Sequence, residues 1–94
     1  MNKEKLYKQI IEYLRKYNPK RIAVFGSYAR DEETKKSDID LLVNFGNDIT
    51  LLDLVEMKEN LYKVLGIKVD IITENAMNKN IKKYIIHDLQ IIYE

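Results

Sequence analysis

The chain contains the run Ile22-Ala23-Val24-Phe25-Gly26-Ser27 and, after ten further residues, Asp38-Ile39-Asp40-Leu41-Leu42-Val43. The first run predicts a short buried strand over residues 22–25 that ends at a Gly-Ser turn, and the second predicts a strand over residues 38–45. Residues i and i+2 of a strand point to the same face, so the carboxylates of Asp38 and Asp40 are expected to project together. Adjacent carboxylates repel, and at neutral pH the pair needs a shared proton or a cation.

The Gly26-Ser27 step is expected at a strand-to-helix junction, because Ser27 to about Glu33 is predicted to form a helical turn or a short helix. Such a junction offers backbone N–H groups and a helix N-terminus, both of which suit phosphate. An ordinary turn with a helix N-cap is the alternative, and it uses the same amides. Carboxylates for magnesium beside donors for phosphate are the minimum requirement for phosphoryl or nucleotidyl transfer.

The rest of the chain alternates predicted helices and strands. Apolar residues at helical spacing predict a first helix that stops at Asn18-Pro19, and Thr50 with Asp53 resembles a capping box before a second helix. Further elements are expected at residues 67–73 (strand), 78–88 (helix) and 89–93 (extended), with Gly66 as a helix C-cap. This order predicts an α/β (α+β) fold, a small mixed β-sheet with helices packed on it, in a single domain over residues 1–94.

Asp70 is an acidic residue within an otherwise apolar predicted strand. A charge in a buried strand is costly unless it is paired or metal-bound, although an edge-strand residue that faces water is the alternative. If this strand lies beside the strand of Asp38 and Asp40, the three carboxylates form one cluster. Hard oxygen donors suit Mg²⁺ or Mn²⁺ rather than zinc, and two such ions would stabilise the attacking oxygen and a leaving pyrophosphate.

Composition narrows the classes of function. With 46% hydrophobic residues, 33% charged residues and a net charge of +1, a globular protein is expected, with no direct nucleic-acid binding and no membrane binding. The absence of cysteine excludes disulfides and thiolate metal sites. No signal-peptide core and no run as long as a membrane span is found, so the expected location is cytoplasmic.

The spacing of Gly26-Ser27 and Asp38-x-Asp40, with an isolated strand aspartate at Asp70, resembles the DNA polymerase β nucleotidyltransferase superfamily. More narrowly, the chain resembles the minimal nucleotidyltransferase (MNT) proteins over essentially its whole length, which implies a palm-like nucleotidyltransferase core. The resemblance implies that Asp38 and Asp40 ligate two magnesium ions and that Asp70 holds the catalytic ion and helps to deprotonate the incoming hydroxyl. It also implies phosphate-binding roles for three residues, Gly26, Ser27 and Arg30.

The resemblance further implies ATP and a HEPN-type ribonuclease toxin as partners. MNT proteins are typically the antitoxins of such toxins, which they neutralise by transferring AMP to a tyrosine hydroxyl. An antitoxin that acts by binding alone is the alternative, and Asp31, where the family usually has glycine, gives it some support. A surface ion pair of Arg30 with Asp31 or Glu33 is the alternative to its phosphate contact. A small domain with edge strands is also a candidate for self-association.

Overall fold

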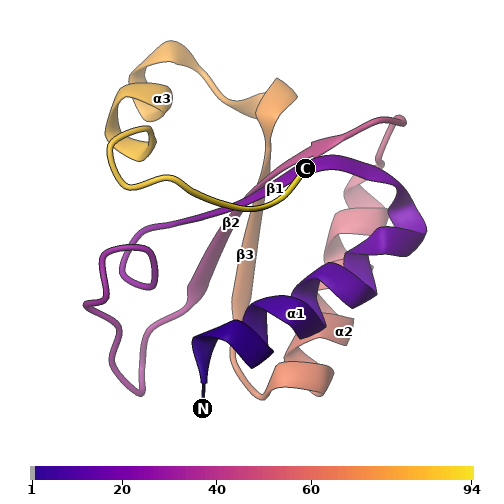
Figure 1. The fold of residues 1–94 in the computed structure, drawn as a ribbon. Helices are drawn as coiled ribbons and strands as arrows, with labels where there is room; N and C mark the ends of the chain where they lie inside the picture. The colour runs from indigo at the N-terminus through magenta and orange to yellow at the C-terminus, as the bar shows by residue number, and fades with distance from the viewer. Residues whose placement is uncertain (1) are drawn as a thin grey trace.

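Within residues 2–94, which the computed structural model describes, four strands form one mixed sheet in the order β3-β2-β1-β4 (Figure 1). β1 (Pro19–Phe25) runs antiparallel to β2 (Ile39–Phe45) and to β4 (Gln90–Tyr93), whereas β2 and β3 (Val69–Thr73) are parallel. Parallel neighbours need a crossover connection, and α2 (Leu51–Leu65) supplies it. The predicted mixed sheet is confirmed.

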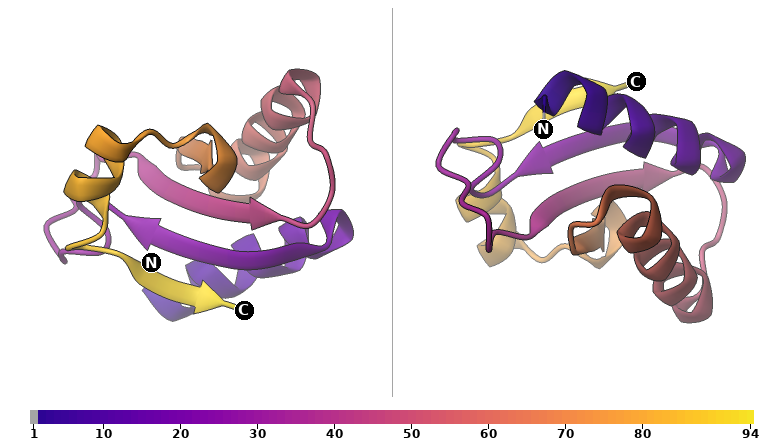
Figure 2. Two further views of the ribbon diagram at one scale, coloured as in Figure 1. Left: turned by 90° about the horizontal axis from the view of Figure 1, so that it is seen from above. Right: turned by 90° about the horizontal axis from the view of Figure 1, so that it is seen from below.

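One face of the sheet carries the main core. Strand residues that alternate along the chain, such as Ile22 and Val24 in β1, point toward α1 (Lys3–Leu14) and α2. The right-hand view of Figure 2 shows these two helices in front of the strands and α3 behind them. The fully buried side chains of this core include Leu6, Ile10, Leu14, Ile39, Leu41, Val43, Met57 and Leu61.

The other face is covered only in part. α3 (Lys79–Ile85) places Ile85 against Ala23 and Leu42 of the sheet. Asp40 and Asp70 alternate with the main-core residues of their strands and therefore belong to this second face. Two 3₁₀ turns complete the described elements, at Arg15–Tyr17 and Glu74–Ala76.

The predicted helix boundaries near residues 18, 50 and 66 are confirmed by local geometry. Asn18 is left-handed, with φ of 54°, and ends the first helical segment directly before Pro19. The Thr50 side chain accepts from the Asp53 N–H, and the Asp53 carboxylate accepts from the Thr50 N–H, which completes the capping box. Gly66 ends α2 with φ of 73°.

Several other boundaries differ from the prediction. β1 begins at Pro19 rather than residue 22, because its first residues pair with the end of β2 through an irregular register. β3 begins at Val69 rather than residue 67. α3 ends at Ile85 rather than near residue 88, because residues 86–88 form a turn in which the Asp88 N–H donates to Ile85 O. None of the helices in residues 2–94 is long and apolar enough to cross a membrane.

Candidate functional site

Asp40 and Asp70 lie side by side on adjacent parallel strands, where they are register partners. The sequence predicts Asp38 as the first residue of the strand, but it lies one residue before β2. Asp38 is exposed to solvent. Burial, followed by the charges of Asp70 and Asp38, raises the pKa of the Asp40 carboxyl, whereas the charge of Arg30 acts in the opposite direction. The fold thus brings the three predicted carboxylates into one neighbourhood, with Asp40 at its centre.

Asp70 is already paired with a cation of the protein itself. Its Oδ1 atom lies 3.2 Å from Nζ of Lys58 in α2, and both side chains are about half exposed. Within residues 2–94, no three acidic, histidine or cysteine side chains are arranged to hold one metal ion. The donor chemistry nevertheless fits a hard divalent cation, because such an ion would neutralise carboxylates that now repel one another.

An open groove of about 520 Å³ starts at Asp38 and Asp70 and runs along the last turns of α2. Its lining adds the side chains of Lys58, Tyr62 and Lys63. β3 is an outer strand of the sheet, so this groove opens at the sheet edge rather than in its middle. A segment of another protein can therefore approach Asp70 from solvent.

Gly26 packs directly against the Asp40 carboxylate. The preceding residue, Phe25, is the register partner of Asp40, which brings the end of β1 beside the start of β2. A Cβ atom on Gly26 would lie 3.3 Å from Asp40 Cγ and closer still to Oδ2. Gly26 also has φ of +74°, a conformation that L side chains adopt at a cost. The Gly-Ser motif and the Asp-x-Asp motif are therefore in direct contact.

The sequence predicts a helical turn or a short helix after Gly26. The structure has a single hydrogen-bonded turn there, and the described residues from this turn to β2 form no helix. The Arg30 N–H donates to Gly26 O at 3.1 Å, and the Glu32 N–H donates to Ser27 O at 2.9 Å. Asp31 then adopts φ of 58°, in the left-handed region that ends a right-handed turn. We call residues 26–33 the phosphate turn, after the role that the sequence predicts for Gly26 and Ser27.

The first residues of the phosphate turn carry backbone N–H donors without partners in the described part of the chain. Among residues 2–94, the N–H groups of Ser27, Tyr28 and Ala29 have no hydrogen-bond acceptor. Unpaired N–H groups at the start of a helical turn bind anions well, even without a following helix. These N–H groups follow Gly26, which lies against the Asp40 carboxylate, at the place where the sequence predicts phosphate binding.

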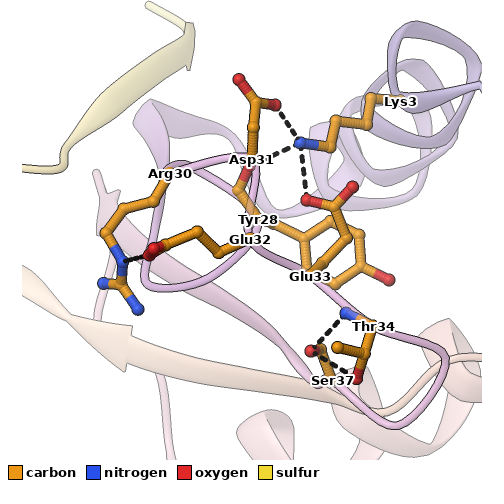
Figure 3. Close-up of polar contacts among 8 residues, drawn as sticks. All are labelled: Lys3, Tyr28, Arg30, Asp31, Glu32, Glu33, Thr34 and Ser37. Carbon is orange, nitrogen blue, oxygen red and sulfur yellow. Dashed lines mark hydrogen bonds and ion pairs between the residues drawn. The ribbon is translucent and has the colours of Figure 1, made fainter.

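Arg30 makes ion pairs, but with partners other than those predicted. Its guanidinium lies 2.9 Å from Glu32 Oε1 and 3.2 Å from Asp88 Oδ2, rather than against Asp31 or Glu33. Figure 3 shows the Arg30–Glu32 contact on the opposite side of the phosphate turn from Asp31. Both ion pairs are exposed enough to exchange for a phosphate.

Two lysines that no sequence motif marks contact this site. Lys58 pairs with Asp70, and Lys3 of α1 pairs with Asp31, as Figure 3 shows for the latter. Each contact joins residues of different elements, so no spacing in the sequence signals it. The Asp31 side chain, 85% exposed, points toward Lys3 and α1.

A family model described as "Nucleotidyltransferase domain" matches residues 7–92. The chain belongs to this nucleotidyltransferase family. The matched residues include every carboxylate, turn and groove residue described above. The predicted family assignment and α+β fold are both confirmed.

Relatives of this nucleotidyltransferase agree with that assignment. A protein of Methanocaldococcus jannaschii named "Putative protein adenylyltransferase" is 44% identical over 94% of this chain and 95% of its own. The fold matches a crystal structure of a toxin–antitoxin with AMP-PNP (TM-score 0.85, 21% identity, 93% of this chain and 72% of the other). It also matches a tri-AMPylated Shewanella oneidensis HEPN toxin in complex with MNT antitoxin (TM-score 0.81, 19% identity, 98% and 72%).

Proposed function

We propose that this nucleotidyltransferase is a magnesium-dependent protein adenylyltransferase of the cytoplasm and the antitoxin of a toxin–antitoxin pair. It transfers AMP from ATP to a tyrosine hydroxyl of a HEPN-type ribonuclease toxin and thereby neutralises the toxin. One observation carries the proposal: Asp40 lies between Asp70 on the neighbouring strand and Gly26 at the start of the phosphate turn. Carboxylates for a metal and N–H donors for phosphate thus share one site.

The comparisons support the choice of nucleotide and acceptor. The M. jannaschii relative is named for protein adenylyl transfer. Of the two similar solved structures described above, one contains AMP-PNP and the other contains an AMPylated HEPN toxin.

Each part of the site has a role in the proposed reaction. Asp38, Asp40 and Asp70 would hold Mg²⁺, as two ions, with Mn²⁺ as a substitute. The bound metal would neutralise charge on the phosphates and on the leaving pyrophosphate. The Ser27 hydroxyl and the unpaired N–H groups of the phosphate turn would bind the terminal phosphates, and Arg30 would add a charge-assisted contact.

The transfer itself exchanges one bond at phosphorus for another. The acceptor oxygen bonds to the α-phosphorus, the bond from the α-phosphorus to the bridging oxygen breaks, and pyrophosphate leaves. The hydroxyl proton passes to Asp70, which lies at the open groove where a protein segment can enter. Asp40 is more enclosed and is therefore assigned to binding rather than to proton transfer.

An antitoxin that blocks its toxin by binding alone is the second candidate. The observation that favours it is the Lys58–Asp70 ion pair, since a carboxylate held by a lysine is not free for a metal or a proton. This candidate predicts neutralisation without nucleotide. The adenylyltransferase predicts that neutralisation requires Mg²⁺ and ATP.

Label transfer from α-phosphate-labelled ATP to the purified toxin tests the proposal. Wild type is compared with Asp38→Asn/Asp40→Asn and with the matched control Asp48→Asn, an exposed aspartate beyond the other end of β2. Label on the toxin with wild type and Asp48→Asn, but not with the double variant, is expected. No label with any protein, while all three still neutralise the toxin, would establish the binding-only antitoxin.

A further inference from the structure

We propose that Lys3 is a positioning residue for ATP binding. Its ammonium group holds the phosphate turn in the conformation that offers the Ala29 N–H to a triphosphate, and it neutralises the acidic residues that end the turn. This inference rests on the proposed function, because the ligand in question is the ATP triphosphate.

Lys3 gathers three acceptors of the phosphate turn around one ammonium group. Nζ donates to the backbone oxygen of Tyr28 at 2.8 Å, pairs with the Asp31 carboxylate, and lies 2.7 Å from Glu33 Oε1. Figure 3 shows Lys3 reaching from α1 across to these residues. The two carboxylates raise the pKa of Lys3, and Lys3 lowers the pKa of the Glu33 carboxyl, so Lys3 and Glu33 stay charged near neutral pH.

The contact with Tyr28 O fixes the direction of the next N–H group. In a planar trans peptide the C=O and N–H bonds point in opposite directions. The Tyr28 oxygen accepts from Lys3 Nζ at 2.8 Å and, within the turn, from the Asp31 N–H at 3.4 Å. Because Lys3 makes the shorter contact and lies on α1, the carbonyl is held toward α1 and the Ala29 N–H points away from it. The Tyr28 side chain is buried as well, at 7% exposure, so the residue is held at both ends.

The charges of the phosphate turn explain why a cation is needed at this place. The turn carries Arg30 and three acidic residues, and Arg30 pairs with one of them, Glu32. Lys3 is the cation that contacts the other two, Asp31 and Glu33. Without Lys3, two unneutralised carboxylates would lie on the segment that binds an anionic ligand.

The backbone conformation of Asp31 is a second reason why the Lys3 contact is needed. Its φ of 58° is unfavourable for a side-chain-bearing residue, although aspartate tolerates it better than most. The ion pair with Lys3 holds Asp31 in place and directs its charge toward α1 (Figure 3). The Lys3–Asp31 pair thereby makes an acidic residue acceptable at a position that suits glycine.

Equilibrium binding of ATP with Mg²⁺ to Lys3→Met tests the inference. Lys5→Met is the matched control, because Lys5 is an exposed lysine of the same helix turn with no ion pair among residues 2–94. Lys3→Met is expected to weaken ATP binding roughly tenfold, and Lys5→Met by less than about twofold. Lys3→Arg should retain most of the affinity, because a guanidinium also donates to several acceptors. Hydrogen exchange of the Arg30 and Glu32 amides, which are hydrogen-bonded within the phosphate turn, should accelerate only in Lys3→Met.

The double variant Lys3→Met/Asp31→Gly separates positioning from general stability. It should recover part of the lost ATP affinity, because it removes one unpaired carboxylate and the strained φ. Equal ATP binding by wild type and Lys3→Met would overturn the role of Lys3 but leave the proposed function intact. A double variant that binds ATP no better than Lys3→Met would do the same. If wild type itself does not bind ATP, both this role and the proposed function are wrong.

Discussion

Replacing Gly26 with alanine should separate the stability of the fold from the integrity of the site. Gly26 has φ of +74° and lies against Asp40, and an added Cβ would come 3.3 Å from Asp40 Cγ. Gly66 has nearly the same φ, +73°, but nothing lies within 4 Å of the Cβ that it would gain. Gly66→Ala therefore carries the backbone cost without the contact, and the two variants form a matched pair.

The backbone cost of a side chain in the left-handed region is about 1–2 kcal/mol. For a domain of this size, each kcal/mol lowers Tm by roughly 4–8 °C. The contact adds little to this cost, because the Asp40 carboxylate can rotate away from the new methyl group. Both variants are therefore expected to lose about 1–2 kcal/mol of unfolding free energy, and to differ by less than about 1 kcal/mol.

The site should respond quite differently in the two variants. A rotated Asp40 no longer faces Asp70 and the phosphate turn, so Gly26→Ala should lose at least about a hundredfold in adenylyl transfer. Gly66→Ala should retain transfer within about threefold when assayed below its Tm. The stabilisation of each protein by Mg²⁺, measured as a shift in Tm, should be lost only in Gly26→Ala.

Two outcomes would contradict this reasoning. Gly26→Ala with near-wild-type transfer would show that the Asp40 carboxylate has no fixed place in the reaction. Equal loss of transfer in Gly66→Ala would show that general destabilisation, not the Gly26–Asp40 contact, reduces activity. Urea unfolding curves of all three proteins, with and without Mg²⁺, provide the stability half of the comparison.

Two further predictions concern the carboxylates. Asp40→Asn should raise the free energy of unfolding at pH 7, because burial and the charges of Asp70 and Asp38 disfavour the ionised carboxyl. A raised carboxyl pKa means that the folded state binds the proton more tightly than the unfolded state, so wild type should become as stable as Asp40→Asn as the pH falls through the raised pKa toward 3.8. Urea unfolding between pH 7 and pH 4 measures the stability difference between the two proteins. A difference that grows on acidification contradicts the prediction. Lys58→Met should change the unfolding free energy by less than about 1 kcal/mol, because its pair with Asp70 is half exposed. It should also tighten Mn²⁺ binding severalfold, measured by electron paramagnetic resonance, whereas an unchanged affinity would show that Lys58 does not compete with the metal.

Features that depend on near neighbours in the chain were predictable. The capping box of Thr50 and Asp53 involves residues three apart, and the Gly66 cap depends on the conformation of one residue. Short apolar runs rich in β-branched residues placed the strands on the correct segments, within about three residues. The spacing of the Gly-Ser and Asp-x-Asp motifs predicted a shared site, and the direct pairing of the two consecutive strands brings the motifs together.

Other features depended on which elements meet in space. Asp70 became a neighbour of Asp40 only through the parallel pairing of β2 and β3, a condition that the sequence leaves open. The partners of the charged residues were not predictable either: Arg30 pairs with Asp88, 58 positions away, and Asp31 pairs with Lys3. Backbone propensities act over a few residues, whereas an ion pair at a surface is selected by whichever charged side chains the packed helices bring within reach. The chain thus encodes its strands, caps and motifs locally, and packing determines which lysines, Lys3 and Lys58, pair with three of its acidic residues.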